Sequence, residues 1–230
     1  MTTPQRIQSI IFDFDGTLAV LTLDFNDMKR RLGAMASNYI DNFPQVDGMP
    51  ALEWVEVLTR AVADELGEDT GMEFNTRCRF LIMDMELAGA RRGELFSFTR
   101  PMLVDLRERG VKIGVVTRNC TPAVKAVFPD IDTYCECLLA REDVAEVKPH
   151  PGHVQAALER LGVSPQSALM VGDHPMDVLG GKRAGTMGAG VCSGRKEHAV
   201  FLKAGADFMA ADCMELMRIL EREKLLPAKN

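Results

Sequence analysis

The sequence has no excess of positive charge. It contains 27 lysines and arginines against 33 aspartates and glutamates, so the formal net charge is -6, and the pI is about 5.3. A protein that is held on nucleic acid by neutralising phosphates needs a basic surface. We therefore expect no nucleic-acid partner.

Long apolar runs are also missing. No run approaches the roughly 18 residues that a membrane-spanning helix needs. The N-terminal segment MTTPQRIQSIIF has only a short apolar patch before two aspartates, which is too little for the apolar region of a signal peptide. We expect a cytoplasmic protein with no membrane contact.

Paired cysteines of the C-x-x-C kind do not occur. The six cysteines are Cys78, Cys120, Cys135, Cys137, Cys192 and Cys213. Because no export signal places them in an oxidising compartment, we expect reduced thiols. Cys135 and Cys137 lack a second pair of ligands, so alternation along a strand explains their spacing better than a metal site does.

The sequence does contain short, β-branched apolar runs that alternate with helical stretches after residue 100. Runs in which both the odd and the even positions are apolar are typical of parallel strands that are covered on both faces. The expected fold class is therefore α/β, with a doubly wound parallel sheet. The expected strands cover residues 7–12, 112–117, 135–139, 167–171, 187–192 and 207–209. Expected helices of this part cover residues 100–109, 121–127, 151–161, 175–184, 196–204 and 212–224.

About a hundred residues separate the first two strands, which is far longer than the usual crossover between parallel strands. This stretch is almost wholly helical in pattern, and the expected helices cover residues 25–43, 50–66 and 68–92. It predicts a small helical domain inserted into the sheet domain. An apolar stripe on the third helix is expected to form its core, and consists of Met72, Phe80, Met83, Met85 and Leu87.

The strongest chemical signal is IIFDFDGTL, in which an apolar strand runs into Asp13 and Asp15 and then a Gly-Thr turn. Residues two apart at a strand end can project into one pocket beyond the sheet. Two such close acids repel each other, and a cation would relieve the repulsion. An Asx turn would explain one aspartate but not this pair.

Three further strand ends carry matching groups. In VGDHPMD, Asp173 ends a buried run and Asp177 lies in the first turn of the next helix. Thr117 ends the run IGVVT, and Lys148 precedes another helix. Four carboxylates around a hard cation such as Mg²⁺, with a lysine and a threonine for phosphate oxygens, form a complete set for phosphoryl transfer.

These motifs, in this order, resemble the four motifs of the haloacid dehalogenase (HAD) superfamily: DFDGT, a hydrophobic strand ending in Thr, the Lys, and GDxxxD. The resemblance covers residues 6–20 and 98 to about 225. It implies a Rossmann-like catalytic core of residues 1–20 and 98–230, with an α-helical first-type cap domain at 21–97. It also implies that the first strand lies between the second and the fourth.

The resemblance also implies roles for the acids. Asp13 resembles the nucleophile, and Asp15 resembles the general acid that later activates water. Mg²⁺ is the implied cofactor. Its implied ligands are Asp13, Asp173 and the backbone carbonyl of Asp15, while Asp177 supports these ligands without contacting the metal.

A second implied set binds phosphate, and it comprises Asp13, Gly16, Thr117, Arg118 and Lys148. Arg118 stands where many relatives have another residue, so it either contacts substrate or lies on the surface. Near the return from the insertion, Arg91, Arg92 and Arg100 could bind an acidic substrate, although a solvated surface explains at least two of them.

The expected function is a Mg²⁺-dependent phosphatase of the phosphoglycolate-phosphatase-like group, a hydrolase acting on a small organic phosphate such as phosphoglycolate or a sugar phosphate through an aspartyl-phosphate. A phosphosugar mutase of the β-phosphoglucomutase type and a non-catalytic phosphate-binding module remain as alternatives. Asp15 argues against dehalogenation, and a phosphonate hydrolase would need a cap lysine, for which Lys29 is the candidate. The partner is a small phosphate ester, and the chain is a monomer or a homodimer.

Overall fold

The computed structural model describes residues 6–45, 48–194 and 198–229. The chain forms two compact units, one of Met1–Leu21 with Ala90–Asn230 and one of Thr22–Gly89. The return from the insertion, at 89/90, lies eight residues before the expected boundary at 97/98. We describe each unit by itself.

The larger unit is built on a six-stranded parallel sheet with the order β5-β4-β1-β6-β7-β8. The strands are β1 Ser9–Phe12, β4 Lys112–Val116, β5 Cys137–Leu139, β6 Ala168–Gly172, β7 Met187–Val191 and β8 Phe208–Ala210. All five neighbouring pairs are parallel. This confirms the predicted fold class, and the first strand lies between the second and the fourth as expected.

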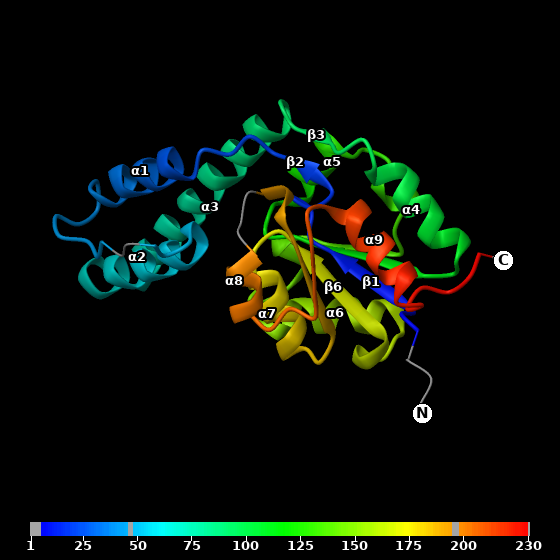
Figure 1. Cartoon of the computed structure of the whole chain (residues 1–230). Coiled ribbons are helices and arrows are strands. Elements are labelled where there is room, and N and C mark those ends of the chain that lie inside the picture. Colours follow the sequence, from blue (N-terminus) through cyan, green and yellow to red (C-terminus); the bar gives the residue numbers. More distant parts are fainter. Residues whose placement is uncertain (1–5, 46–47, 195–197, 230) are drawn as a thin grey trace. The chain divides into compact units, whose positions relative to one another are not determined.

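Helices cover both faces of this sheet, with α6 and α7 on one face and α4 and α9 on the other (Figure 1). The helices of this unit are α4 Thr99–Glu108, α5 Thr121–Val127, α6 Pro151–Leu161, α7 Pro175–Arg183, α8 His198–Lys203 and α9 Cys213–Arg222. Short 3-10 turns lie at Ile131–Thr133, Arg141–Asp143, Pro165–Ser167 and Cys192–Gly194. The expected start of the helix at 196 lies outside the described residues.

The central position of β1 follows from its composition. All four residues of SIIF are buried, which requires cover on both faces. Ile11 packs in a cluster with Val154 and Leu158 of α6 and with Met170 of β6. The acids that follow β1 and β6 are therefore attached to fully buried strands in the middle of the sheet.

Two very short strands were not predicted. β2, Ala19–Val20, pairs antiparallel with β3, Glu94–Leu95, and a further bond runs from Phe96 N to Leu18 O. The hydroxyl of Thr99 donates to the same Leu18 oxygen at 2.6 Å. This pairing fixes the chain where it leaves the sheet domain and where it returns.

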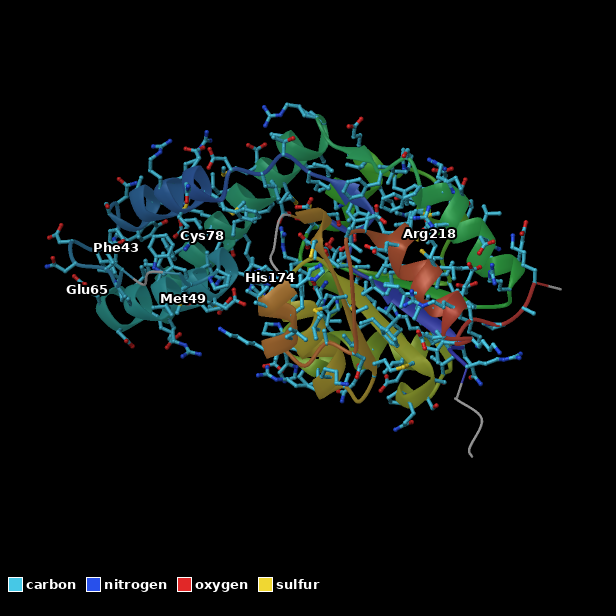
Figure 2. All side chains as sticks on the ribbon, in the orientation of Figure 1. Phe43, Met49, Glu65, Cys78, His174 and Arg218 are labelled. Carbon is cyan, nitrogen blue, oxygen red and sulfur yellow. The ribbon has the colours of Figure 1, made fainter. Side chains whose placement is uncertain are left out.

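The smaller unit contains α1 Phe25–Ala36, α2 Ala51–Leu66 and α3 Glu68–Ala90 in its described part. Its core includes Leu32, Trp54, Phe74 and Cys78, and Figure 2 shows Cys78 among the side chains of these helices. Trp54 also donates its indole N–H to the carbonyl of Pro44 at 2.8 Å.

The expected apolar stripe on α3 was partly wrong. Met72 and Phe80 are about 60% exposed, whereas Met85 packs against the core. At about 100° per residue, the buried face defined by Phe74 and Cys78 turns Met72 and Phe80 outward.

Helix α1 ends seven residues before the predicted residue 43. Ser37 and Asn38 bond the carbonyls of Gly33 and Ala34 with their side chains, both at 3.1 Å, and so occupy acceptors of the last turn.

Residues 226–229 near the C-terminus are held in place by packing and polar contacts. Leu226 is buried, Pro227 accepts a bond from Arg109, and Lys229 pairs with Asp105 at 2.5 Å. The six cysteines are free thiols, as predicted. Among the described residues, the helices are all too short or too polar to span a membrane.

Adjacent glycines on α7 test how closely this helix approaches the sheet. A methyl group on Gly181 would lie 2.5 Å from Cβ of Met170, whereas one on Gly180 would meet nothing closer than 3.6 Å. We expect Gly181→Ala to lower the free energy of unfolding by about 1–3 kcal/mol through overpacking. Gly180→Ala, the control, should be neutral or stabilising by up to about 1 kcal/mol, since alanine favours helix. Equal effects in urea denaturation would contradict this packing.

Candidate active site

The predicted functional residues follow the carboxyl ends of adjacent strands. Asp13 comes directly after β1, Thr117 after β4 and Asp173 after β6. The backbone N–H of Asp13 donates to Val171 O at 2.8 Å, which continues the β1–β6 pairing up to the site. Because β4, β1 and β6 are neighbours, these residues meet at one edge of the sheet.

A buried lysine joins three parts of this edge. The Lys148 side chain is 1% exposed, and its Nζ lies 2.6 Å from Oδ1 of Asp13 and 2.7 Å from Oδ1 of Asp177. Its third acceptor is the carbonyl of Val116, at 2.8 Å. An ammonium group has three N–H donors, so all of them are used within the protein.

The acids themselves approach closely. Oxygen atoms of Asp13, Asp173 and Asp177 lie within 4.8 Å of one another. Glycine makes this approach possible: a Cβ on Gly16 would lie 2.2 Å from Oδ2 of Asp173, and one on Gly172 would lie 2.1 Å from Oδ2 of Asp177. Either added methyl would displace a carboxylate of the cluster.

Asp177 is fixed in the first turn of α7. Its Oδ2 accepts the backbone N–H of His174 at 3.0 Å, while Nδ1 of His174 accepts the N–H of Met176 at 3.2 Å. His174 thus caps the helix N-terminus, at the position labelled in Figure 2. The cap leaves the other oxygen of Asp177 to Lys148.

Burial and mutual repulsion make the acids hard to ionise. Burial raises the pKa of Asp13 to about 7, against the attraction of Lys148 and with the help of the charges of Asp177 and Asp15. Burial and the charges of Asp13, Asp177 and Asp15 raise the pKa of Asp173 to about 8. Burial acts to lower the pKa of Lys148, but Asp13 and Asp177 outweigh it and the pKa is raised. One ammonium therefore does not balance the cluster.

This donor set fits a hard divalent cation. It offers only carboxylate oxygens, the ligands that Mg²⁺ prefers, and the three acids have one ammonium, Lys148, which pairs with two of them. Asp15 does not belong to this group of described carboxylates. Its Oδ1 instead accepts the backbone N–H of Leu21 at 2.8 Å.

The loop that contains Gly16 is tightly closed. Gly16 has a φ of +78°, and its N–H donates to Ala19 O at 2.7 Å. The carbonyl of Gly16 accepts the hydroxyl of Ser193 at 2.5 Å. In this state the Gly16 amide is used within the loop and does not face outward for phosphate.

Thr117 and Arg118 lie beside Lys148. Oγ1 of Thr117 accepts the N–H of Asn119 at 3.1 Å, and the hydroxyl still has its own hydrogen to donate. Nη1 of Arg118 donates to the carbonyl of Lys148 at 2.5 Å and lies 3.4 Å from the sulfur of Met176. Arg141 donates to the carbonyl of Arg118 at 3.2 Å, so the Arg118 backbone is held as well.

Arg100 has a structural role. It forms two bonds with Asp130, at 2.5 and 2.6 Å, and one with the Tyr134 hydroxyl at 3.0 Å. Its guanidinium lies over the ring of Phe128, 4.7 Å from the centroid.

Sequence reasoning missed two residues that touch this edge, Ser193 and His153. Ser193 follows β7, so the strand-end argument applied to a fifth strand could have found it. His153 is fully buried on α6 and bonds the backbone of Lys148. A single histidine in a helix gives no pattern that would predict this contact.

The comparisons with known proteins agree with this geometry. The model of the haloacid dehalogenase-like hydrolase family matches residues 7–185, which include Asp13, Thr117, Lys148, Asp173 and Asp177. The chain belongs to this family. The predicted superfamily is therefore confirmed, and the chain is a hydrolase.

Named relatives span nearly the whole chain. The pyrophosphatase PpaX of Bacillus cereus (strain AH820) is 28% identical over 221 residues, which cover 94% of this chain and 97% of the relative. A crystal structure of a predicted phosphoglycolate phosphatase from Haemophilus somnus 129PT gives a TM-score of 0.64 at 22% identity, covering 95% and 99% of the two chains. A protein from Thermotoga maritima named for β-phosphoglucomutase gives 0.59 at 20% identity, covering 94% and 99%. The two structures show a shared fold.

The buried lysine gives a test of the electrostatics. In Lys148→Met, Asp13 and Asp177 lose their counter-charge, so we expect the free energy of unfolding to fall by about 3–5 kcal/mol at pH 8. The loss should be smaller at pH 6. At that pH the buried carboxylates of the folded variant can bind protons, whereas the same groups are mostly ionised in the unfolded chain, so proton binding stabilises the folded variant. Urea denaturation at both pH values measures this.

Lys125→Met is the matched control, since Lys125 and Asp132 form an exposed pair at 2.7 Å that should contribute less than about 1 kcal/mol. A loss in Lys148→Met that is equally small, or independent of pH, would contradict the ion-pair network.

Proposed function

We propose that this chain is a Mg²⁺-dependent phosphatase that hydrolyses a small organic phosphate through an aspartyl-phosphate on Asp13. One observation carries the proposal: Lys148 holds Oδ1 of Asp13 at 2.6 Å, inside a cluster with Asp173 and Asp177. Phosphoryl transfer needs a positioned nucleophile and compensation of its charge at one point. Catalysis would belong to the unit that contains these residues, and residues 22–89 would form the cap domain.

The first step follows from the way Asp13 is held. Lys148 bonds Oδ1, so Oδ2 is the oxygen that attacks phosphorus. A bond forms between Oδ2 and phosphorus while the bond from phosphorus to the leaving oxygen breaks. Asp15 gives its proton to that leaving oxygen, two residues further along the same strand end.

The second step returns the enzyme to its starting state. Asp15, now a carboxylate, takes a proton from water, and the water oxygen attacks the phosphorus of the aspartyl-phosphate. The bond from Oδ2 to phosphorus breaks, and inorganic phosphate leaves. Lys148 keeps Asp13 in one orientation through both steps, because its other bonds run to Asp177 and to the carbonyl of Val116.

Asp13, Asp173 and the backbone carbonyl of Asp15 would hold Mg²⁺, with Asp177 beside them. Bound there, Mg²⁺ supplies the positive charge that lets an anionic nucleophile approach an anionic phosphate. The hydroxyl of Thr117 and the guanidinium of Arg118 would bind phosphate oxygens. Lys148 could contact phosphate only by giving up one of its three present partners.

Two substrate classes are supported by names of relatives. The PpaX relatives are named pyrophosphatases, and the Haemophilus somnus protein is named for phosphoglycolate. Both compounds pair the phosphate with a second acidic group, and Arg118, which directly follows Thr117, supplies a positive side chain beside the backbone of Lys148. A small acidic phosphate ester or pyrophosphate therefore suits the site best.

Phosphate release is the first test. The purified chain should release inorganic phosphate from an aryl phosphate and from members of a panel with pyrophosphate, phosphoglycolate and sugar phosphates, and a chelator should abolish the release. Asp13→Asn should lower kcat at least about a thousandfold, since it removes the nucleophile.

Asp64→Asn changes an exposed acid of α2 and is the control. Equal activity of wild type and Asp13→Asn would refute the covalent mechanism. A requirement for a sugar bisphosphate without net phosphate release would favour the mutase, and phosphate binding without turnover would favour the binding module.

Metal binding should depend on pH in a defined direction. The raised pKa values of Asp13 and Asp173, about 7 and about 8, mean that the metal-free cluster is partly protonated at neutral pH. Mg²⁺ must displace these protons, so its apparent affinity should rise from pH 6 through pH 8 and level off only at higher pH, once Asp173 is ionised. Calorimetry in buffers with different ionisation enthalpies should detect proton release at pH 7, and Asp173→Asn should reduce it. Affinity that is independent of pH would show that the acids are already ionised.

A further inference from the structure

His153 is a buried titratable group to which the reaction above gives no role. It lies in the first half of α6, is 0% exposed, and has one polar partner for each ring nitrogen. Nε2 lies 3.1 Å from the carbonyl of Leu139. Nδ1 accepts the backbone N–H of Lys148 over a longer distance, 3.4 Å.

The two partners fix the protonation of the ring. A carbonyl can only accept, so Nε2 must carry a hydrogen, and a backbone N–H can only donate, so Nδ1 must be bare. Burial, together with the charges of Lys148 and Arg118, lowers the pKa of His153 to about 4, against the bond to Leu139. The ring is therefore neutral and has a single tautomer at neutral pH.

The carbonyl of Leu139 has a second donor. The backbone N–H of Thr117 donates to it at 3.0 Å. One imidazole thus connects the end of β5, the strand end at Thr117 and the backbone of Lys148. The strand end at Thr117 supplies the hydroxyl of the proposed site, and the Lys148 segment supplies the cation.

The side chain of Lys148 depends on where its backbone lies. Its Nζ has to reach Asp13, Asp177 and the Val116 carbonyl together, at 2.6 to 2.8 Å. Lys148 lies in the segment between the 3-10 turn Arg141–Asp143 and α6, outside any helix or strand. A bond from α6 to the Lys148 backbone supplies a fixed point that regular secondary structure does not.

We propose that His153 is a positioning residue, which sets the backbone of Lys148 relative to Thr117 so that the lysine can hold Asp13 for attack. The inference rests on the proposed function and adds to it a residue that touches neither substrate nor metal. His153 acts through Lys148 and through the Leu139 carbonyl.

Three substitutions separate the two bonds of the ring. His153→Leu removes both, His153→Asn keeps an acceptor oxygen near the place of Nδ1, and His153→Gln keeps a donor nitrogen near the place of Nε2. Gln155→Leu, at an exposed position of α6, is the control. Each variant is compared for kcat and KM with an aryl phosphate, and for the affinity of the Mg²⁺-loaded protein for inorganic phosphate.

We expect His153→Leu to lower kcat and phosphate affinity each about fivefold to tenfold, the size of one hydrogen bond, because, of its two lost bonds, the one to Lys148 acts on the nucleophile. His153→Asn should recover most of this loss, and His153→Gln less of it, because the bond to Lys148 is the one that acts on the nucleophile. Wild-type kcat and phosphate affinity in a His153→Leu protein with a lowered Tm would overturn the proposal, since they would show a purely structural role.

A measurement without turnover tests the hydrogen bonds directly. In ¹H–¹⁵N NMR of the four histidines, the signal that is lost in His153→Asn should show a hydrogen on Nε2 and a bare Nδ1 down to about pH 5. A hydrogen on Nδ1 would overturn the proposal. If the wild type releases phosphate from no compound, the proposed function fails, while the tautomer and the phosphate affinities still decide the role of His153.

Discussion

A buried ammonium group is the point on which this site depends. A lysine that is 1% exposed can stay charged only if acceptors replace its lost water, because an unpaired buried ion is strongly destabilising. Lys148 finds three acceptors, on Asp13, Asp177 and Val116, which come from the ends of β1 and β4 and the start of α7. The strand order and the position of α7 are thus conditions for burying this charge, and the charge in turn selects one arrangement of the acids.

The positive charge of Lys148 does not neutralise the whole acidic cluster. Three carboxylates share one ammonium, so burial and repulsion still raise the pKa of Asp13 and Asp173. The fold tolerates this because Gly16 and Gly172 leave room for the carboxylates. A divalent cation would relieve the repulsion between these carboxylates, so the feature that weakens the metal-free protein would favour metal binding.

Much of this could be predicted from the sequence, because its signals are local. An apolar run that ends in Asp13 or Asp173 marks a buried strand with an acid at its carboxyl end, and parallel topology brings such ends together. The β2–β3 pairing could not be predicted, since each strand has two residues and the partners are far apart in sequence. The outward position of Phe80 was also missed, because an apolar stripe does not tell which of two faces meets the other helices.

In the proposed function, the contacts of Lys148 would also separate two tasks that a phosphate site must perform. With its three hydrogens committed, Lys148 would orient Asp13 and compensate charge, so recognition of the phosphate would fall to other donors. Thr117 and Arg118 follow the same strand, β4, whose last carbonyl already binds Lys148. Arg118 moreover bonds the backbone carbonyl of Lys148, and His153 bonds its N–H. The groups for recognition and the group for orientation are therefore attached to one short segment of backbone, and a shift of that segment would alter binding and nucleophile geometry together.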